Sequence, residues 1–137
     1  TADSMVGHLS PKYKYFGWAS ARLDDAANFI PARLTALLIF LTALIIPSTK
    51  GFKSLRSCLT YANRHRSTNA GWPEAAMAGA LDIRIAGPRV YNGIVVNDPW
   101  MGDGNPILGT NDINRALKLY FSSNIINALI LVLLLFI

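Results

Sequence analysis

The residues best able to do chemistry centre on Glu74, which follows a Gly-Trp-Pro corner. Pro73 suits the first position of a helix, where its missing N–H costs nothing, and a carboxylate beside it is stabilised by the positive end of the helix dipole. The alanines and glycine that continue to Leu81 leave little side-chain bulk, so another helix or a large flat ligand could approach this backbone closely. Local physics leaves two interpretations open: a capped, tightly packed structural helix, or a ligand site built around one carboxylate.

A second group of reactive side chains surrounds the adjacent carboxylates Asp24 and Asp25. Arg22, Asp25 and Arg33 recur at helical spacing together with Phe29, so these side chains share one face of a helix. Carboxylates are suitable ligands for Mg²⁺, and arginine can hold a phosphate through two parallel hydrogen bonds. The structural alternative is equally concrete: ion pairs with Asp25 within the helix, and an arginine at the membrane edge.

Four blocks follow one another along the chain: DSMVGH at residues 3–8, FGWASARLDDAANFIPARL at residues 16–34, NAGWPEAAMAGAL at residues 69–81, and the scattered positions Gly87, Pro88, Tyr91, Gly93, Asp112, Ile113, Ala116 and Leu117. In this order they resemble the CobD/CbiB family, the membrane-bound adenosylcobinamide-phosphate synthases of cobalamin biosynthesis. Two positions depart from the family pattern. Thr68 replaces the usual proline, which we expect to loosen the loop entering the site, and Asp82 adds a charge where glycine is usual.

The resemblance implies amide-bond formation between a carboxylate of adenosylcobyric acid and the amine of an aminoalcohol phosphate of the aminopropanol phosphate type. A carboxylate does not condense with an amine unaided at neutral pH, so we expect activation by ATP and Mg²⁺, with the corrinoid as substrate. The expected catalytic residues are Glu74, Asp24 and Asp25, and the expected metal ligand is Asp3. The expected substrate-binding residues are Arg22, Arg33, Ser4, Asn69 and Trp72.

Weaker candidates lie further along the chain. Arg84 and Arg89 are candidates for binding the phosphate or the corrin amides, with a solvated basic edge as the alternative. Asp103 is a weak candidate for metal binding. No phosphate-binding loop or dinucleotide-binding glycine pattern is present, so an ATP site here would be of an uncommon kind. The single cysteine, Cys58, excludes an intrachain disulfide, and we expect it to be a packing residue.

The composition indicates a membrane protein, because 52% of the 137 residues are hydrophobic and only 15% are charged. Residues 34–49 carry no charge, but sixteen helical residues cover only about 24 Å of a hydrocarbon core of roughly 30 Å. Residues 119–137 also carry no charge and are long enough to span. We therefore expect an all-α fold, with integral membrane helices at about 34–46 and 119–137 and a cytoplasmic, motif-bearing helical and loop region at 50–118.

Charge sets the expected orientation. The run from Lys50 to Arg66 holds five basic residues and no acid, and residues 50–118 hold nine basic and five acidic side chains. Such a region next to apolar segments is expected to face the cytoplasm and anionic lipid rather than nucleic acid. If 34–46 crossed the bilayer, however, Asp25 and Glu74 would lie at opposite faces. A broken or re-entrant first helix would resolve that conflict.

The resemblance also implies a cell-membrane, multi-pass protein of which these residues are the C-terminal portion, completed by an N-terminal half. Two alternatives remain open: a non-catalytic membrane component that binds or transports a corrinoid, and an inactive fragment.

Overall fold

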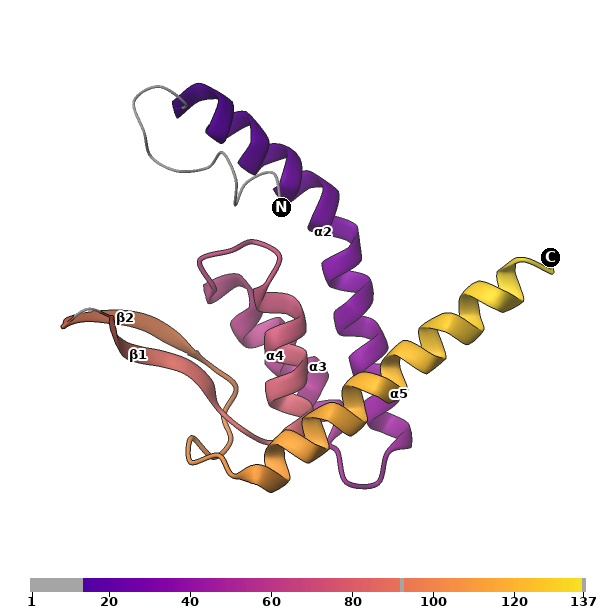
Figure 1. Ribbon diagram of the computed structural model, residues 1–137. Coiled ribbons are helices and arrows are strands. Elements are labelled where there is room, and N and C mark those ends of the chain that lie inside the picture. The colour runs from indigo at the N-terminus through magenta and orange to yellow at the C-terminus, as the bar shows by residue number, and fades with distance from the viewer. Residues whose placement is uncertain (1–13, 92, 137) are drawn as a thin grey trace.

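The computed structural model describes residues 14–91 and 93–136. Within these residues, five shorter elements follow one another along the chain between two long helices, and Figure 1 shows their arrangement. The order is α2 (Lys14–Ile45), α3 (Gly51–Tyr61), the 3₁₀ turn η1 (Ala62–Arg64), α4 (Gly71–Leu81), the strands β1 (Ile85–Tyr91) and β2 (Ile94–Met101), and α5 (Thr110–Leu134).

Helix α2 joins the second sequence block to the first apolar segment without a break. Pro31 lies inside it, and the Pro31 carbonyl accepts a hydrogen bond from Thr35 Oγ1 at 2.8 Å. One face of the apolar half is buried, including Ala36, Ile39 and Ala43. The expectation of a broken helix is therefore wrong: the chain reverses only after α2 has ended, and α3 then packs along it.

Helices α3 and α4 form an antiparallel pair that packs on this apolar half of α2 (Figure 1). The small residues of α4 serve this packing, since a Cβ added at Gly79 would lie 2.4 Å from the Lys53 carbonyl oxygen of α3. Ser54 Oγ of α3 donates to the Ala76 carbonyl of α4 at 2.9 Å within the buried contact. The small-residue stretch thus packs tightly against a helix of the same chain, as the structural interpretation predicted, although no side chain caps the start of α4.

A two-stranded antiparallel hairpin corrects the all-α prediction. Its register pairs Ile85 with Met101 and Tyr91 with Ile94, and the connecting Asn92-Gly93 step is a typical two-residue hairpin turn in sequence. A bulge at Gly87, whose φ is +76°, admits the ring of Trp100 against the backbone. The glycines, prolines and polar residues of 87–109 predicted an ordered loop, with a short extended piece at 89–96 as the alternative. Both strands are edges, where proline is tolerated.

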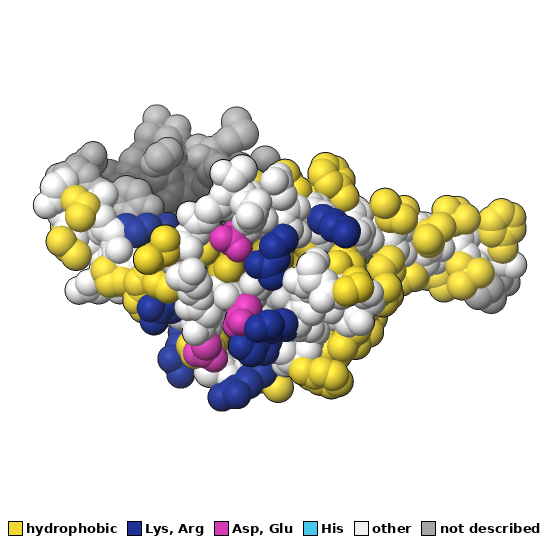
Figure 2. All heavy atoms as spheres, turned by 90° about the horizontal axis from the view of Figure 1, so that it is seen from below, with side chains coloured by type: hydrophobic (Ala, Val, Ile, Leu, Met, Phe, Trp, Pro, Cys, Tyr) yellow, Lys and Arg dark blue, Asp and Glu magenta, His cyan; other side chains and the backbone are white. Residues whose placement is uncertain are grey.

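Helix α5 begins at Thr110 after the N-cap residue Gly109, whose N–H donates to the Asp112 carboxylate at 3.0 Å. Arg115 attaches the N-terminal part of α5 to the rest of the protein by donating hydrogen bonds to the Ser48 and Leu81 carbonyls, each at 3.0 Å. Beyond this N-terminal part, α5 projects away from the other elements and is covered with hydrophobic side chains (Figure 2). Trp18–Ile45 and Thr110–Leu134 are both long and apolar enough to cross a membrane, by length and composition.

Candidate functional site

The two motif blocks meet at the start of α4. Arg33 Nη1 on α2 donates to Asn69 Oδ1 at 2.6 Å, and Asn69 Nδ2 donates to the Asp25 carbonyl at 2.9 Å. The same guanidinium donates to the Thr68 carbonyl at 3.3 Å. Asn69 is buried, with 7% of its surface exposed. Both ends of its amide are therefore used to hold the loop before α4 against α2.

This contact removes the topological conflict seen in the sequence. Because α3 runs back along the apolar half of α2, the loop after η1 returns to the level of Asp25. Asp25 and the start of α4 thus lie at the same end of the helix pair, whatever the position of α2 relative to a bilayer. The structure brings together the two blocks that a simple crossing would have separated.

A cavity of about 590 Å³ opens beside this contact, within the size range of small-molecule sites. The predicted shared face of α2 forms one wall of it, which confirms that prediction. The lining residues are Arg22, Asp25, Ala26, Phe29, Ile30, Arg33, Asn63, His65 and Thr68.

The cavity wall is cationic and aromatic near its base. The Arg33 guanidinium lies 3.7 Å from the ring centroid of Phe29 and 4.9 Å from that of Trp72. Among the described residues, Arg33 donates its hydrogen bonds to neutral oxygens, so Arg33 does not form the expected ion pair with Asp25. Its positive charge remains available to an anionic group in the cavity, while its position is fixed.

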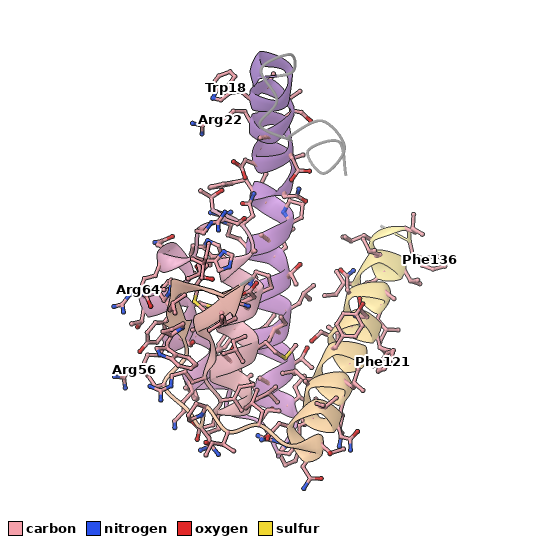
Figure 3. The ribbon with its side chains drawn as sticks, turned by 60° about the vertical axis from the view of Figure 1, so that its left-hand side comes forward. Trp18, Arg22, Arg56, Arg64, Phe121 and Phe136 are labelled. Carbon is pink, nitrogen blue, oxygen red and sulfur yellow. The ribbon has the colours of Figure 1, made fainter. Side chains whose placement is uncertain are left out.

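Asp24 and Asp25 are divided between two hollows. A second cavity of about 380 Å³ also lies between α2 and the loop before α4, and both carboxylates line it. Only Asp25 also lines the 590 Å³ cavity, as expected for adjacent helical residues about 100° apart. Arg22 lies nearer the N-terminal end of α2, where its guanidinium is 5.7 Å from the Trp18 ring centroid and extends outward from the helix (Figure 3).

Glu74 has a partner that the sequence did not indicate. His65 Nε2 lies 3.6 Å from Glu74 Oε2, and the two side chains are 24% and 39% exposed. His65 Nδ1 lies 3.0 Å from the Ser67 backbone nitrogen and 3.3 Å from the Ser67 carbonyl oxygen. When Nδ1 accepts the Ser67 N–H, the neutral ring carries its proton on Nε2, which faces the carboxylate. Glu74 itself is outside the lining of the 590 Å³ cavity, and His65 connects it to that wall. No spacing rule could have found this pair, because a turn of irregular backbone creates it.

Trp72 lies in the second position of α4 and packs against the core. Its carbonyl accepts from the Cys58 thiol at 3.5 Å, and one face of its indole meets the Arg33 guanidinium. The indole Nε1 is buried without a hydrogen-bond partner in the described structure. Burial raises the pKa of the Cys58 thiol to about 11, so this cysteine is a packing residue, as predicted.

Asp3 and Ser4 lie outside the described residues. Within the described part of the chain, no group of three His, Cys, Asp or Glu side chains is placed to hold a metal ion. A Mg²⁺ ion that arrives on nucleotide phosphates needs only one or two protein carboxylates, so Asp25 with Asp24 remains compatible with one. Asp103 is instead engaged by the Tyr61 hydroxyl, which donates to its carboxylate.

The two departures from the family pattern have local explanations. Thr68 Oγ1 donates to Asp25 Oδ1 at 3.3 Å, so this residue adds a contact to the loop. Asp82 ends α4 in a left-handed conformation, φ +58°, which explains why glycine suits the position. Its carboxylate bridges Lys50 at 2.5 Å and Lys53 at 2.7 Å, and these lysines hold the pKa of Asp82 below its ordinary value.

The fold and the site define a mostly helical protein with two helices suited to a membrane. Its cavity, lined by arginine and carboxylate side chains, lies between the first of these helices and the loop before α4. The CobD/CbiB protein family model matches residues 1–120, and the chain belongs to this family. Proteins named "Cobalamin biosynthesis protein CobD" are similar to it: one from a Sinorhizobium species is 51% identical over 128 residues, covering 90% of this chain and 39% of the relative.

Two further relatives with the same name give similar values. The Rhodobacter capsulatus protein is 50% identical over 120 residues, covering 88% of this chain and 37% of its own length. The Klebsiella pneumoniae protein is 46% identical over 119 residues, covering 87% and 37%. The chain thus spans about two fifths of the curated relatives it matches. No solved structure matches the chain.

Proposed function

We propose that this chain is the C-terminal portion of a cobalamin-biosynthesis synthase, which joins adenosylcobyric acid to an aminoalcohol phosphate through an amide bond. One observation carries the proposal: Arg33, Asn69 and Asp25 draw the two family blocks into a single site beside a cavity of about 590 Å³. Family membership and relatives named for cobalamin biosynthesis support the pathway.

The side chains have the types that amide formation needs. Arg33, with Arg22 further out, provides positive charge for phosphate in the cavity. Glu74, oriented by the Nε2–H of His65, takes a proton from the incoming ammonium and frees the amine for attack. Asn69 positions Arg33 through a hydrogen bond, and the Trp72 ring packs against the Arg33 guanidinium. Bound ATP and Mg²⁺ would supply activation of the corrin carboxylate, with Asp25, Asp24 and Asp3 as the residues to hold the metal.

We further propose a multi-pass protein of the cell membrane, with the site on the cytoplasmic side. The excess of nine basic over five acidic side chains in residues 50–118 supports this orientation. An exposed cysteine introduced as Asn63→Cys reports the side, because buried Cys58 has a raised pKa and reacts slowly. We expect an impermeant maleimide to label it in inverted vesicles and not in intact cells. Labelling in intact cells would contradict the orientation.

The function is tested by supplying the chain, alone and joined to the upstream portion of a family member, to purified membranes with adenosylcobyric acid. We expect adenosylcobinamide phosphate from the joined protein only when ATP, Mg²⁺ and the aminoalcohol phosphate are all present. Corrinoid binding that is independent of ATP and the aminoalcohol phosphate, without product, would favour a binding or transport component. Neither binding nor product from a correctly inserted joined protein would indicate an inactive fragment.

A further inference from the structure

We infer that a phosphate monoester binds in a separate cavity of about 510 Å³ between the loop after η1 and the β-hairpin. This inference rests on the proposed function, in which the phosphate belongs to the aminoalcohol substrate. The cavity is lined by His65, Arg66, Ser67, Arg89, Val96 and Asp98.

The cavity has the donors that a phosphate requires. Arg66 comes from the loop and Arg89 from β1, so two guanidinium groups reach the same hollow from different elements. Asp98 on β2 accepts from Arg89 Nη2 at 2.9 Å and holds that guanidinium in place across the strands. No carboxylate pairs with Arg66 among the described residues. The charged side chains lining the cavity are thus two arginines and one aspartate, and planar guanidinium groups suit phosphate oxygens.

Ser67 adds a hydroxyl donor at the same wall. Its Oγ accepts the backbone N–H groups of Asn69 and Ala70, each at 3.3 Å, which fixes the side chain against the loop. The hydroxyl proton is not used by these two bonds, so it can be donated to a phosphate oxygen. The loop that presents Asn69 to α2 therefore also presents Ser67 and Arg66 to the 510 Å³ cavity.

His65 joins this cavity to the proposed reaction site. It lines both the 510 Å³ cavity and the 590 Å³ cavity, and its Nε2 faces Glu74. A short molecule with a phosphate at one end and an amine at the other can place the phosphate on Arg66 and Arg89 and direct the ammonium past His65 towards Glu74. The two-cavity arrangement would thus select a phosphorylated aminoalcohol over the free aminoalcohol.

The test compares Arg66→Gln and Arg89→Gln with Arg64→Gln in the joined protein, purified in lipid-free detergent. Arg64 is an exposed control two residues from Arg66, with its guanidinium 5.0 Å from the Tyr61 ring centroid and outside this cavity (Figure 3). We expect each cavity variant to raise KM for aminopropanol phosphate at least about tenfold, the effect of one lost charged hydrogen bond. The values of KM for the corrinoid and for ATP should stay within about twofold, and Arg64→Gln should change none of them.

Calorimetric titration with aminopropanol phosphate, without corrinoid, separates this inference from the proposed function. Binding that is lost in Arg66→Gln, in a protein that forms no amide, would support the cavity and contradict the proposed function. Product formation with unchanged KM for aminopropanol phosphate in both variants would overturn the cavity and leave the function. A raised KM for ATP alone would assign the arginines to nucleotide phosphates. The protein could instead bind vesicles containing phosphatidylethanolamine and not aminopropanol phosphate, with vesicle binding lost in Arg66→Gln. That result would identify the phosphate as a lipid headgroup and overturn the aminoalcohol assignment.

Discussion

Arg33 Nη1 and Asn69 Oδ1 lie 2.6 Å apart although 36 residues separate them in the chain. This bond connects α2 to the loop before α4, and the same amide binds the Asp25 backbone. The connection links the segment that carries Asp25 to the segment that leads into Glu74.

Replacing Asn69 tests that connection. We expect Asn69→Ala to lower the free energy of unfolding by about 1–3 kcal/mol, because it removes two hydrogen bonds from a buried amide and leaves Arg33 without its closest acceptor. Asn63→Ala is the matched control, since Asn63 is exposed in the same region. Denaturant unfolding in detergent measures both. Equal stability of the two variants would show that the connection does not hold the loop.

Two substitutions, His65→Gln and His65→Asn, test the His65–Glu74 pair, because each side-chain amide replaces one of the two ring nitrogens. Gln at position 65 extends an N–H towards Glu74, whereas Asn retains an acceptor near the Ser67 N–H. If His65 positions Glu74, His65→Gln should keep more of kcat than His65→Asn, with little difference between them in KM for the corrinoid. The opposite order would mean that the ring serves only to hold the loop. Steady-state kinetics, with kcat followed against pH, distinguishes these outcomes.

The close contact of α3 and α4 predicts opposite effects for one substitution at two glycines. A Cβ at Gly79 would lie 2.4 Å from the Lys53 carbonyl oxygen and 2.6 Å from Ser57 Cβ, so Gly79→Ser should cost about 1–3 kcal/mol. Gly109 has open space around it, an extended backbone and an N-cap position, so Gly109→Ser should be neutral or slightly stabilising. Thermal unfolding compares the pair, and a stable Gly79→Ser variant would contradict the packing.

The bridge from Asp82 to Lys50 and Lys53 predicts a pH dependence at acid pH. The folded-state pKa of Asp82 is lowered from 3.8, first by the Lys50 hydrogen bond and then by that of Lys53. A lowered carboxyl pKa contributes stability above the unfolded-state value, and the contribution is lost as the pH falls through the lower folded-state value. We therefore expect wild type to exceed Asp82→Asn by less than about 1 kcal/mol at pH 7, since the bridge is partly exposed.

The difference in the free energy of unfolding between wild type and Asp82→Asn should shrink as the pH falls below about 4, and unfolding curves from pH 2 to pH 7 measure it. A difference that grew towards low pH would exclude the carboxylate as its source.

Helical periodicity was sufficient to predict the wall of the 590 Å³ cavity that α2 forms. The spacing of Arg22, Asp25, Phe29 and Arg33 predicted a shared face, and these four side chains do line one cavity. The small residues of 75–80 predicted close helix packing, which Gly79 confirms. Local rules succeed here because both features depend on residues within one helix.

The remaining features depend on contacts between distant segments or on turn chemistry. The Asn92-Gly93 step between Val90 and Ile94 was a hairpin signal in the sequence, but the surrounding prolines favoured a loop. The return of α3 along α2 and the approach of His65 to Glu74 follow from tertiary packing. The spacing of residues along the chain does not predict such contacts.

The most direct test of the proposed site is adenosylcobinamide phosphate formation by the joined protein carrying Glu74→Gln, with membrane insertion and corrinoid binding measured in the same preparation. Gln keeps the size of Glu74 and removes the charge and the proton acceptor. We expect complete loss of product, with insertion and corrinoid binding unchanged. Turnover at the wild-type rate would remove Glu74 from the chemistry and contradict the site proposed at the start of α4.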